Sequence, residues 1–208
     1  MAELRSLVLV LGDQLDLEAA AFDGFDREHD AVWMAEVAEE STHVWSGKPR
    51  TALFLAAMRH FALALRSASR PLHYTRLDAP GNRGSLAAQL RCDIERLKPA
   101  RLVMTAPGDW RVLGDLQQAC DASGAALELL ADTHFLCSRD EFARWAKDRE
   151  SLRMEPFYRR MRARTGVLMD GGEPVSGRWN YDADNRKGFG AKGPGRVPEV
   201  PSFMPDAI

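Results

Sequence analysis

Short apolar runs alternate with longer segments of mixed polarity over the first two thirds of the chain. The first run, residues 7–11, is continuously apolar and ends at Gly12, as expected of a strand buried on both faces of a parallel sheet. The gaps between runs are long enough for helices, and this alternation is typical of βαβ units. The predicted strands cover residues 7–11, 31–37, 72–75, 102–105 and 127–130.

Helices are predicted between these strands because apolar residues recur there every three or four positions. The clearest pattern covers residues 50–68, and two more, 85–97 and 113–122, stop before Pro99 and Gly124, which are usual helix terminators. Together the elements predict an α/β fold of the flavodoxin or Rossmann type. In that fold a five-stranded parallel sheet with strand order 3-2-1-4-5 is flanked by helices.

The pattern changes in the last third of the chain. Helices are predicted at residues 140–145 and 156–164 with no further buried strand, and the sequence is dense in Gly and Pro from Gly171 onward, which favours loops and extended chain. We therefore expect an α/β domain over residues 1–135, a helical extension over 136–170 and an irregular linker over 171–208.

Composition and charge narrow the range of functions. A net charge of −2 over 208 residues gives no global case for binding nucleic acid or membrane. The apolar run near the N-terminus is too short for a signal peptide or a membrane span, so a cytoplasmic location is expected. The three cysteines are far apart and the five histidines form no HExxH motif, so neither a disulfide framework nor a metal site nor a metallohydrolase is predicted.

The loop after the first strand is the first candidate ligand site, because ligands of open parallel sheets bind beyond the carboxyl ends of the strands. Gly12 permits a tight turn and close approach of a ligand, and Asp13 and Gln14 offer polar groups just before Leu15. The loop lacks GxGxxG and GxxxxGK[ST], which disfavours a typical dinucleotide site and a P-loop. A solvated turn with Asp13 as a helix cap is the alternative.

Two further loops should reach the same rim of the sheet. Glu36 lies at the end of the second strand and Glu40 follows it, and their carboxylates are candidates for ligand contact, although such acidic clusters are often solvated. Pro107 and Trp110 follow the fourth strand, where the indole is placed either to stack on a planar ring or to cover the edge of the core. No nucleophile accompanies these residues, so no catalytic residue is predicted.

Basic and aromatic residues gather in residues 149–164. Arg159, Arg160 and Arg162 lie beside Phe157 and Tyr158, a combination that suits a phosphate backbone. A basic helix face turned to solvent or to an acidic partner domain is an equally good interpretation.

Several stretches resemble one known family in order and spacing. They are LVLVLGDQL, MAEVAEE, LFLAAMRHFA, APGDWRV, SLRMEPFYRRMRARTGVLM and GRWNYDADNR. They resemble the N-terminal region of bacterial photolyase-related proteins with an iron–sulfur cluster, a group that includes prokaryotic (6-4) photolyases and related cryptochromes. The resemblance implies light-driven repair of damaged DNA or blue-light sensing by the full-length protein, through FAD and a [4Fe-4S] cluster held in a C-terminal helical domain.

The resemblance also implies a role for this region. The N-terminal domain of the family binds an antenna chromophore, 6,7-dimethyl-8-ribityllumazine, which here would contact loop 12–15 and Glu40. His43 stands where we expect tyrosine in relatives, and Ala106 stands where we expect glutamate. The flavin-binding helices and cluster cysteines have no counterpart in these 208 residues, so this chain alone is expected not to be catalytic and to act with its own C-terminal domain.

Two alternatives remain open at this point. One is a nucleotide- or flavin-binding α/β module without photochemistry, with a phosphate held at the first loop. The other is an interaction domain whose residues 149–164 bind a partner or nucleic acid, with no small-molecule pocket.

Overall fold

The fold is known from a computed structural model that describes residues 4–182, 186–191, 193–204 and 208. The chain divides into two units, the first formed by residues 1–138 together with Ile208 and the second by residues 139–207. Parts of the predicted linker, residues 183–185, 192 and 205–207, lie outside the described residues. In the described part of the chain, no helix combines the length and the apolar character needed to cross a membrane.

A five-stranded parallel sheet forms the centre of the first unit. Its order is β3-β2-β1-β4-β5, so the predicted order 3-2-1-4-5 is confirmed. Leu9 of β1 aligns with Trp33 of β2 and Met104 of β4, and these three strands therefore end nearly level at their carboxyl ends. The strands are β1 (Ser6–Leu9), β2 (Asp30–Ala35), β3 (Leu72–Thr75), β4 (Arg101–Thr105) and β5 (Leu127–Leu130).

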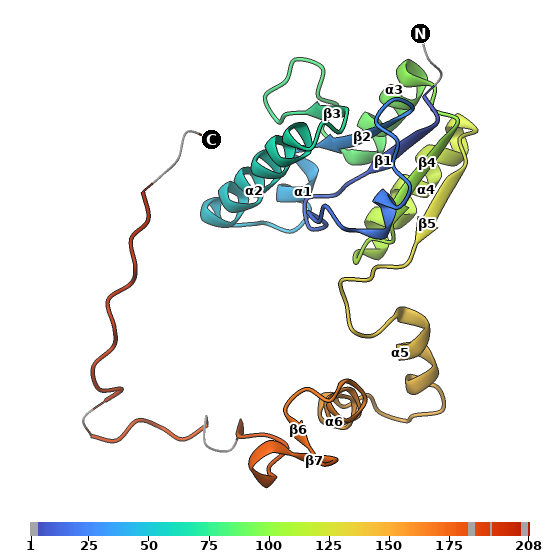
Figure 1. The fold of residues 1–208 in the computed structure, drawn as a ribbon. Helices are drawn as coiled ribbons and strands as arrows, with labels where there is room; N and C mark the ends of the chain where they lie inside the picture. The colour runs from blue at the N-terminus through green and yellow to red at the C-terminus, as the bar shows by residue number, and fades with distance from the viewer. Residues whose placement is uncertain (1–3, 183–185, 192, 205–207) are drawn as a thin grey trace. The chain divides into compact units, whose positions relative to one another are not determined.

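Helices cover both faces of this sheet (Figure 1). Alternate strand residues point to opposite faces, so Leu7, Leu9 and Trp33 pack with α3 (Leu86–Leu97) and α4 (Trp110–Ser123). Val8 and Val32 pack on the other side with α2 (Lys48–Ser67) and the 3-10 turn η1 (Ala20–Phe22). The central strands are buried on both faces, which is why their sequences are continuously apolar.

The helix boundaries differ from the predicted ones where side chains cap the ends. The Asp109 carboxylate accepts a hydrogen bond from the Arg111 backbone N–H, at 2.8 Å, and α4 therefore begins at Trp110 rather than at residue 113. A short helix that the periodicity did not predict, α1 (Glu39–Thr42), follows β2. One turn is too short to show a helical repeat in the sequence.

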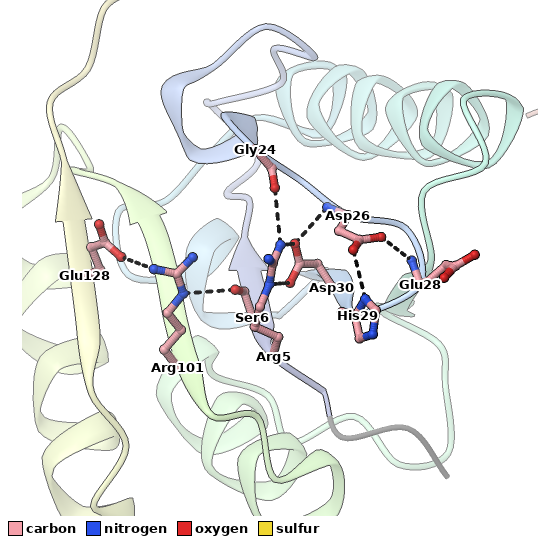
Figure 2. A network of polar contacts seen from close by, with 9 residues as sticks. All are labelled: Arg5, Ser6, Gly24, Asp26, Glu28, His29, Asp30, Arg101 and Glu128. Carbon is pink, nitrogen blue, oxygen red and sulfur yellow. Dashed lines mark hydrogen bonds and ion pairs between the residues drawn. The ribbon is translucent and has the colours of Figure 1, made fainter.

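A polar network closes the amino-terminal edge of the sheet (Figure 2). Arg5 donates to both carboxylate oxygens of Asp30, at 2.9 and 2.6 Å, and the Asp26 backbone N–H donates to the same carboxylate at 2.9 Å. On the neighbouring strand, Arg101 joins Ser6 to Glu128. The Asp30 side chain is only 3% exposed, so this pair is a structural anchor.

Replacing Asp30 with asparagine is expected to lower the free energy of unfolding by about 1–3 kcal/mol at neutral pH. Burial by itself would raise the pKa of Asp30, but hydrogen bonds from Arg5, Asp26 and Ser6 outweigh it and leave that pKa lowered. A lowered folded pKa stabilises the protein above the unfolded pKa of about 3.9, and this contribution is lost as pH falls below it.

Urea titrations of both proteins across this pH range would measure the effect. The difference between Asp30→Asn and the parent should shrink on acidification, whereas Glu128→Gln, in a half-exposed pair, should cost less than about 1 kcal/mol throughout. A loss that is independent of pH would show that packing, and not charge, makes Asp30 important.

The second unit contains α5 (Arg139–Ala146) and α6 (Met154–Thr165), close to the two predicted helices. The pair β6 (Met169–Asp170) and β7 (Glu173–Pro174) and the turn η2 (Val175–Gly177) follow. The predicted linker over residues 171–208 thus contains two short elements, β7 and η2, that the sequence pattern did not predict, and the proposed division into domains stays a prediction. Gly171 and Gly172, with φ of 54° and 88°, make the tight connection of this hairpin, and two-residue strands leave no periodicity in the sequence.

Candidate functional site

A cavity of about 500 Å³ lies at the carboxyl ends of β1, β2 and β4. Its walls come from the loops after these three strands and from the first half of α2. Of the predicted cofactor-binding residues, it brings together Gly12, Asp13, Glu36, Glu40 and Pro107. The loops meet because parallel strands place all their carboxyl ends at the same edge of the sheet.

One wall of this cavity is apolar. Phe54, Leu55 and Met58 contribute from α2, and Val112 contributes from α4. A Cβ atom added to Gly12 would come within 3.0 Å of the Met58 sulfur. Glycine at this position therefore lets helix α2 pack closely on the loop and keeps the cavity open beside it.

The opposite rim is polar and is organised by Arg111. Its guanidinium donates to the Glu40 carboxylate at 2.9 Å and lies 3.6 Å from carboxylate oxygens of Asp109 and Asp115. The hydrogen bond to Glu40 raises the pKa of Arg111, burial opposes this, and the charges of Glu40, Asp109 and Glu39 raise that pKa further. Arg111 thus ties the segment after β2 to the start of α4.

One donor in this rim has no hydrogen-bond partner in the part of the chain that the structure describes. The Nε–H of Arg111 is buried from solvent and makes no hydrogen bond to any described residue. Buried donors are almost always paired, because an unmade hydrogen bond costs about 1–3 kcal/mol. Arg111 lines the cavity, and an acceptor on a bound molecule would satisfy this N–H if it reached it.

Asp13 stands at the centre of an acidic neighbourhood. Partial desolvation raises the pKa of its carboxyl group, a backbone hydrogen bond opposes this, and the nearby carboxylates of Glu40, Asp109 and Asp132 raise it further. The sequence suggested that Asp13 caps a helix as an alternative, but loop 12–15 leads into further loop and the turn η1 rather than into an α-helix.

The Glu36 carboxylate accepts hydrogen bonds from several groups of the protein. Arg59 donates to its two oxygens at 2.8 and 3.0 Å, Tyr74 donates through its hydroxyl, and the Leu77 backbone N–H donates at 2.9 Å. The side chain is fully buried. Its contact with a ligand stays a prediction, while its contribution to the fold is direct: it ties β2 to α2 and to the loop after β3.

Gln14 and Leu15 hold the first loop in place. The Gln14 amide donates to the backbone oxygens of Thr105 and Ala106, both at 3.2 Å, which fastens this loop to the end of β4. Leu15 packs against the core on the α2 side of the sheet. Both residues lie in the wall of a second cavity, next to the first.

Of the remaining candidate residues, some line the first cavity and others do not. His43 lines the first cavity. Trp110 is 84% exposed and is not among the residues that line it, so stacking of its indole on a ligand stays a prediction. Ala106 contributes its backbone oxygen to the contact with Gln14.

Sequence reasoning missed several residues of this site. Arg111 and Asp109 were not singled out, nor was the face of α2 that carries Phe54 and Met58, which was assigned to core packing alone. The signal for Arg111 was present, because an Asp-x-Arg step directly after a buried strand places a cap and a cation at the ligand edge. The signal for α2 was absent, since an apolar helix face looks the same whether it meets the core or a cavity.

The three predicted phosphate-binding arginines have different environments in the second unit. Arg159 pairs with Glu155 at 2.9 Å, and Arg160 is exposed. Arg162 is only 6% exposed and donates to the backbone oxygens of Val167, Leu168 and Trp179. Arg162 is therefore a structural residue, and phosphate contacts by any of the three stay a prediction.

Comparison with known proteins agrees with the resemblance noted in the sequence. The family model for deoxyribodipyrimidine photo-lyase-related protein matches residues 8–208. A (6-4) photolyase of Agrobacterium fabrum strain C58 is 42% identical over 99% of this chain. The chain spans 40% of the length of that relative. With one model matching nearly the whole chain and one relative aligned along it, the chain belongs to the deoxyribodipyrimidine photo-lyase-related protein family.

Proposed function

We propose that the first unit is an antenna domain that holds a planar heterocyclic chromophore in the 500 Å³ cavity. The observation that carries this is the pairing of an apolar wall from α2 with a polar rim centred on Arg111. Small-molecule sites of about 300–1,000 Å³ have this composition, in which apolar surface provides affinity and a few fixed polar groups provide orientation. An antenna makes and breaks no bonds, so it needs no nucleophile or general base.

The residues present fit 6,7-dimethyl-8-ribityllumazine, the antenna chromophore that the family resemblance implies. Phe54 and Met58 would contact its ring faces, and the unpaired Nε–H of Arg111 would donate to an acceptor on the ring. Glu40, already positioned by Arg111, would accept a hydrogen bond from it. When bound, the lumazine supplies absorption of blue light and transfer of the excitation energy.

The activity of the full-length protein is part of the same proposal. We infer that it acts in light-driven repair of (6-4) photoproducts in DNA, or in blue-light sensing, with FAD and a [4Fe-4S] cluster held outside these 208 residues. Its support is the family match and the similarity to the Agrobacterium (6-4) photolyase, of which this chain spans 40%.

Fluorescence titration of the protein with 6,7-dimethyl-8-ribityllumazine tests the antenna role. The expected result is saturable binding that Glu40→Ala weakens by about 10-fold, since the substitution removes a charge-assisted contact and releases Arg111. The matched control is Glu128→Ala, which breaks an arginine–glutamate pair at 3.0 Å on β4 and β5 and should leave the affinity unchanged.

Two outcomes would contradict the proposal. The first is the absence of saturable binding by the parent protein. The second is an equal loss of affinity in Glu40→Ala and Glu128→Ala, which would indicate a general effect on stability. Tight binding of a phosphorylated nucleotide in place of the lumazine would favour the nucleotide-binding alternative.

A further inference from the structure

Residues of α5, of α6 and of the segment between them line a groove of about 570 Å³ in the second unit. This α5–α6 groove shares no lining residue with the two cavities of the first unit. Four cationic side chains line it, one from α5, two from the segment that follows and one from α6. They are Arg144, Lys147, Arg149 and Arg160.

An aromatic cluster holds the two helices together beside this groove. Phe142 and Trp145 of α5 pack on Phe157 of α6, with ring centroids 5.2 and 4.8 Å apart. The Arg149 guanidinium lies 4.4 Å from the Trp145 ring centroid, and its Nε–H donates to the Trp145 backbone oxygen at 2.7 Å. The packing of the helices thus sets the positions of the cations along the groove.

The positive charge of the α5–α6 groove is only partly compensated. Lys147 and Arg160 are exposed, and their side chains make no hydrogen bond or ion pair with any residue that the structure describes. Of the two acidic residues in the lining, Glu141 pairs with Arg164, which leaves the Asp148 carboxylate as the opposing charge. Such an excess of exposed cations attracts a polyanion.

The distribution of charge along the chain makes this segment distinct. Residues 139–165 carry nine Lys or Arg and five Asp or Glu, whereas residues 1–138 carry 14 and 19. The net charge of −2 over the whole chain therefore conceals a basic segment next to an acidic domain. A local basic surface is the electrostatic signature of a nucleic-acid contact.

The lining of the groove indicates which part of a nucleic acid it fits. Trp145 is the one aromatic residue among its lining residues, and it is only 8% exposed, beneath the Arg149 guanidinium. Stacking of bases requires an exposed ring, which these residues do not provide. Contacts made by cations alone go to phosphates and carry no sequence information.

We propose that the α5–α6 groove binds the phosphodiester backbone of duplex DNA through Arg144, Lys147, Arg149 and Arg160. The contact would be independent of base sequence and of damage. This inference rests on the proposed function, because it takes DNA as the substrate of the full-length protein. It goes beyond that function by placing a lesion-independent DNA contact within these 208 residues.

Fluorescence anisotropy of the full-length protein tests this, with a short labelled duplex that is either undamaged or carries a (6-4) photoproduct. Lys147→Gln/Arg160→Gln should weaken binding of both duplexes by about 10-fold and reduce the slope of log affinity against log salt by about 1 for each cation removed. The preference for the damaged duplex should stay as in the parent. Arg66→Gln/Arg91→Gln removes two exposed cations from α2 and α3 and, as the matched control, should change neither quantity.

Asp148→Asn should have the opposite effect. Removing the opposing carboxylate should strengthen binding of both duplexes by a few-fold, because one charge that repels phosphates is lost. Asp148 has φ of 61°, a conformation that asparagine also adopts readily, so the substitution keeps the local fold. A gain in affinity cannot result from partial unfolding. Asp121→Asn, exposed on α4, should leave the affinity unchanged, and an unchanged affinity in Asp148→Asn would count against the groove.

The outcomes separate this inference from the proposed function. If Lys147→Gln/Arg160→Gln binds both duplexes as the parent does, while the damaged duplex is still preferred and repaired, the inference is overturned and the repair function stands. If the parent binds both duplexes equally and repairs neither in blue light, the repair function fails, while a loss of affinity in the double variant would still support the groove. Unchanged DNA affinity with a lower stability of the double variant would assign the groove to an acidic protein surface and refute the proposal.

Discussion

Arg59→Met is expected to lower the free energy of unfolding of the first unit by about 3–5 kcal/mol, because it leaves a buried carboxylate without its cation. The carboxylate is that of Glu36, which is fully buried, while Arg59 is 27% exposed. Burial by itself would raise the pKa of Glu36, but hydrogen bonds from Arg59, Tyr74 and Leu77 outweigh it and lower that pKa. Urea denaturation of parent and variant, followed by circular dichroism, would measure the loss.

The pH dependence of this loss follows from the direction of the shift. Since the folded pKa of Glu36 is lowered, the stability from this pair is present above the unfolded pKa of about 4.3 and disappears as pH falls. The difference between Arg59→Met and the parent should therefore shrink on acidification. Arg76→Met breaks an exposed pair with Asp78 at 3.4 Å and should cost less than about 1 kcal/mol. Equal losses in the two variants would mean that burial of Glu36 does not decide the effect.

Arg162→Met is expected to destabilise the second unit by about 3 kcal/mol or more while leaving the first unit folded. The substitution removes the guanidinium that donates hydrogen bonds to the backbone oxygens of Val167, Leu168 and Trp179. Each buried acceptor left unpaired costs about 1–3 kcal/mol. Hydrogen exchange measured by mass spectrometry resolves the two units. Peptides from α6 and from residues 166–180 should lose protection, and peptides from β1 and β4 should not.

A second variant, Arg160→Ala, distinguishes a structural role of these arginines from a role in DNA binding. Arg160→Ala removes an exposed guanidinium from the same helix and should leave exchange unchanged. If the segment binds a phosphate backbone, this variant should weaken DNA binding by the full-length protein and reduce its salt dependence. Unchanged protection of α6 in Arg162→Met would contradict the structural role assigned to Arg162.

The sheet illustrates what local pattern can predict. Residues 7–11 and 102–105 must be apolar on both sides, because helices cover both faces of the sheet. This requirement is visible in any short window of the sequence. The strand order and the position of loop 12–15 at the ligand edge then follow from the general topology of such folds, and the structure confirmed the order.

Such local patterns could not predict which residues the polar side chains would bond to. Gln14 meets the end of β4 across 91 positions, Arg111 meets Glu40 across 71, and Arg59 meets Glu36 across 23. Nothing in a local window of the sequence identifies the residues with which these side chains pair. Glu36 was accordingly predicted only as a ligand contact, although its carboxylate closes a buried pair.

Arg162 shows the same limit in a charged segment. Its neighbours Arg159 and Arg160 are exposed, and charge density alone predicts one basic surface. The hairpin after α6 instead presents several backbone oxygens to one guanidinium, which Arg162 satisfies from within the second unit. Two-residue strands carry no sequence period, so the burial of Arg162 had no local signal.

The sequence by itself determined the α/β class, the order of the sheet and the edge at which Gly12 and Asp13 lie, because the burial of whole faces imposes a period on neighbouring residues. Only the tertiary structure decided which carboxylates form buried pairs, which line a cavity, and where Thr105 and Arg111 keep a polar atom without a partner among the described residues. The physical reason is that hydrogen bonds and ion pairs are contacts of a few ångströms between residues distant in sequence, and such contacts exist only once the chain has folded.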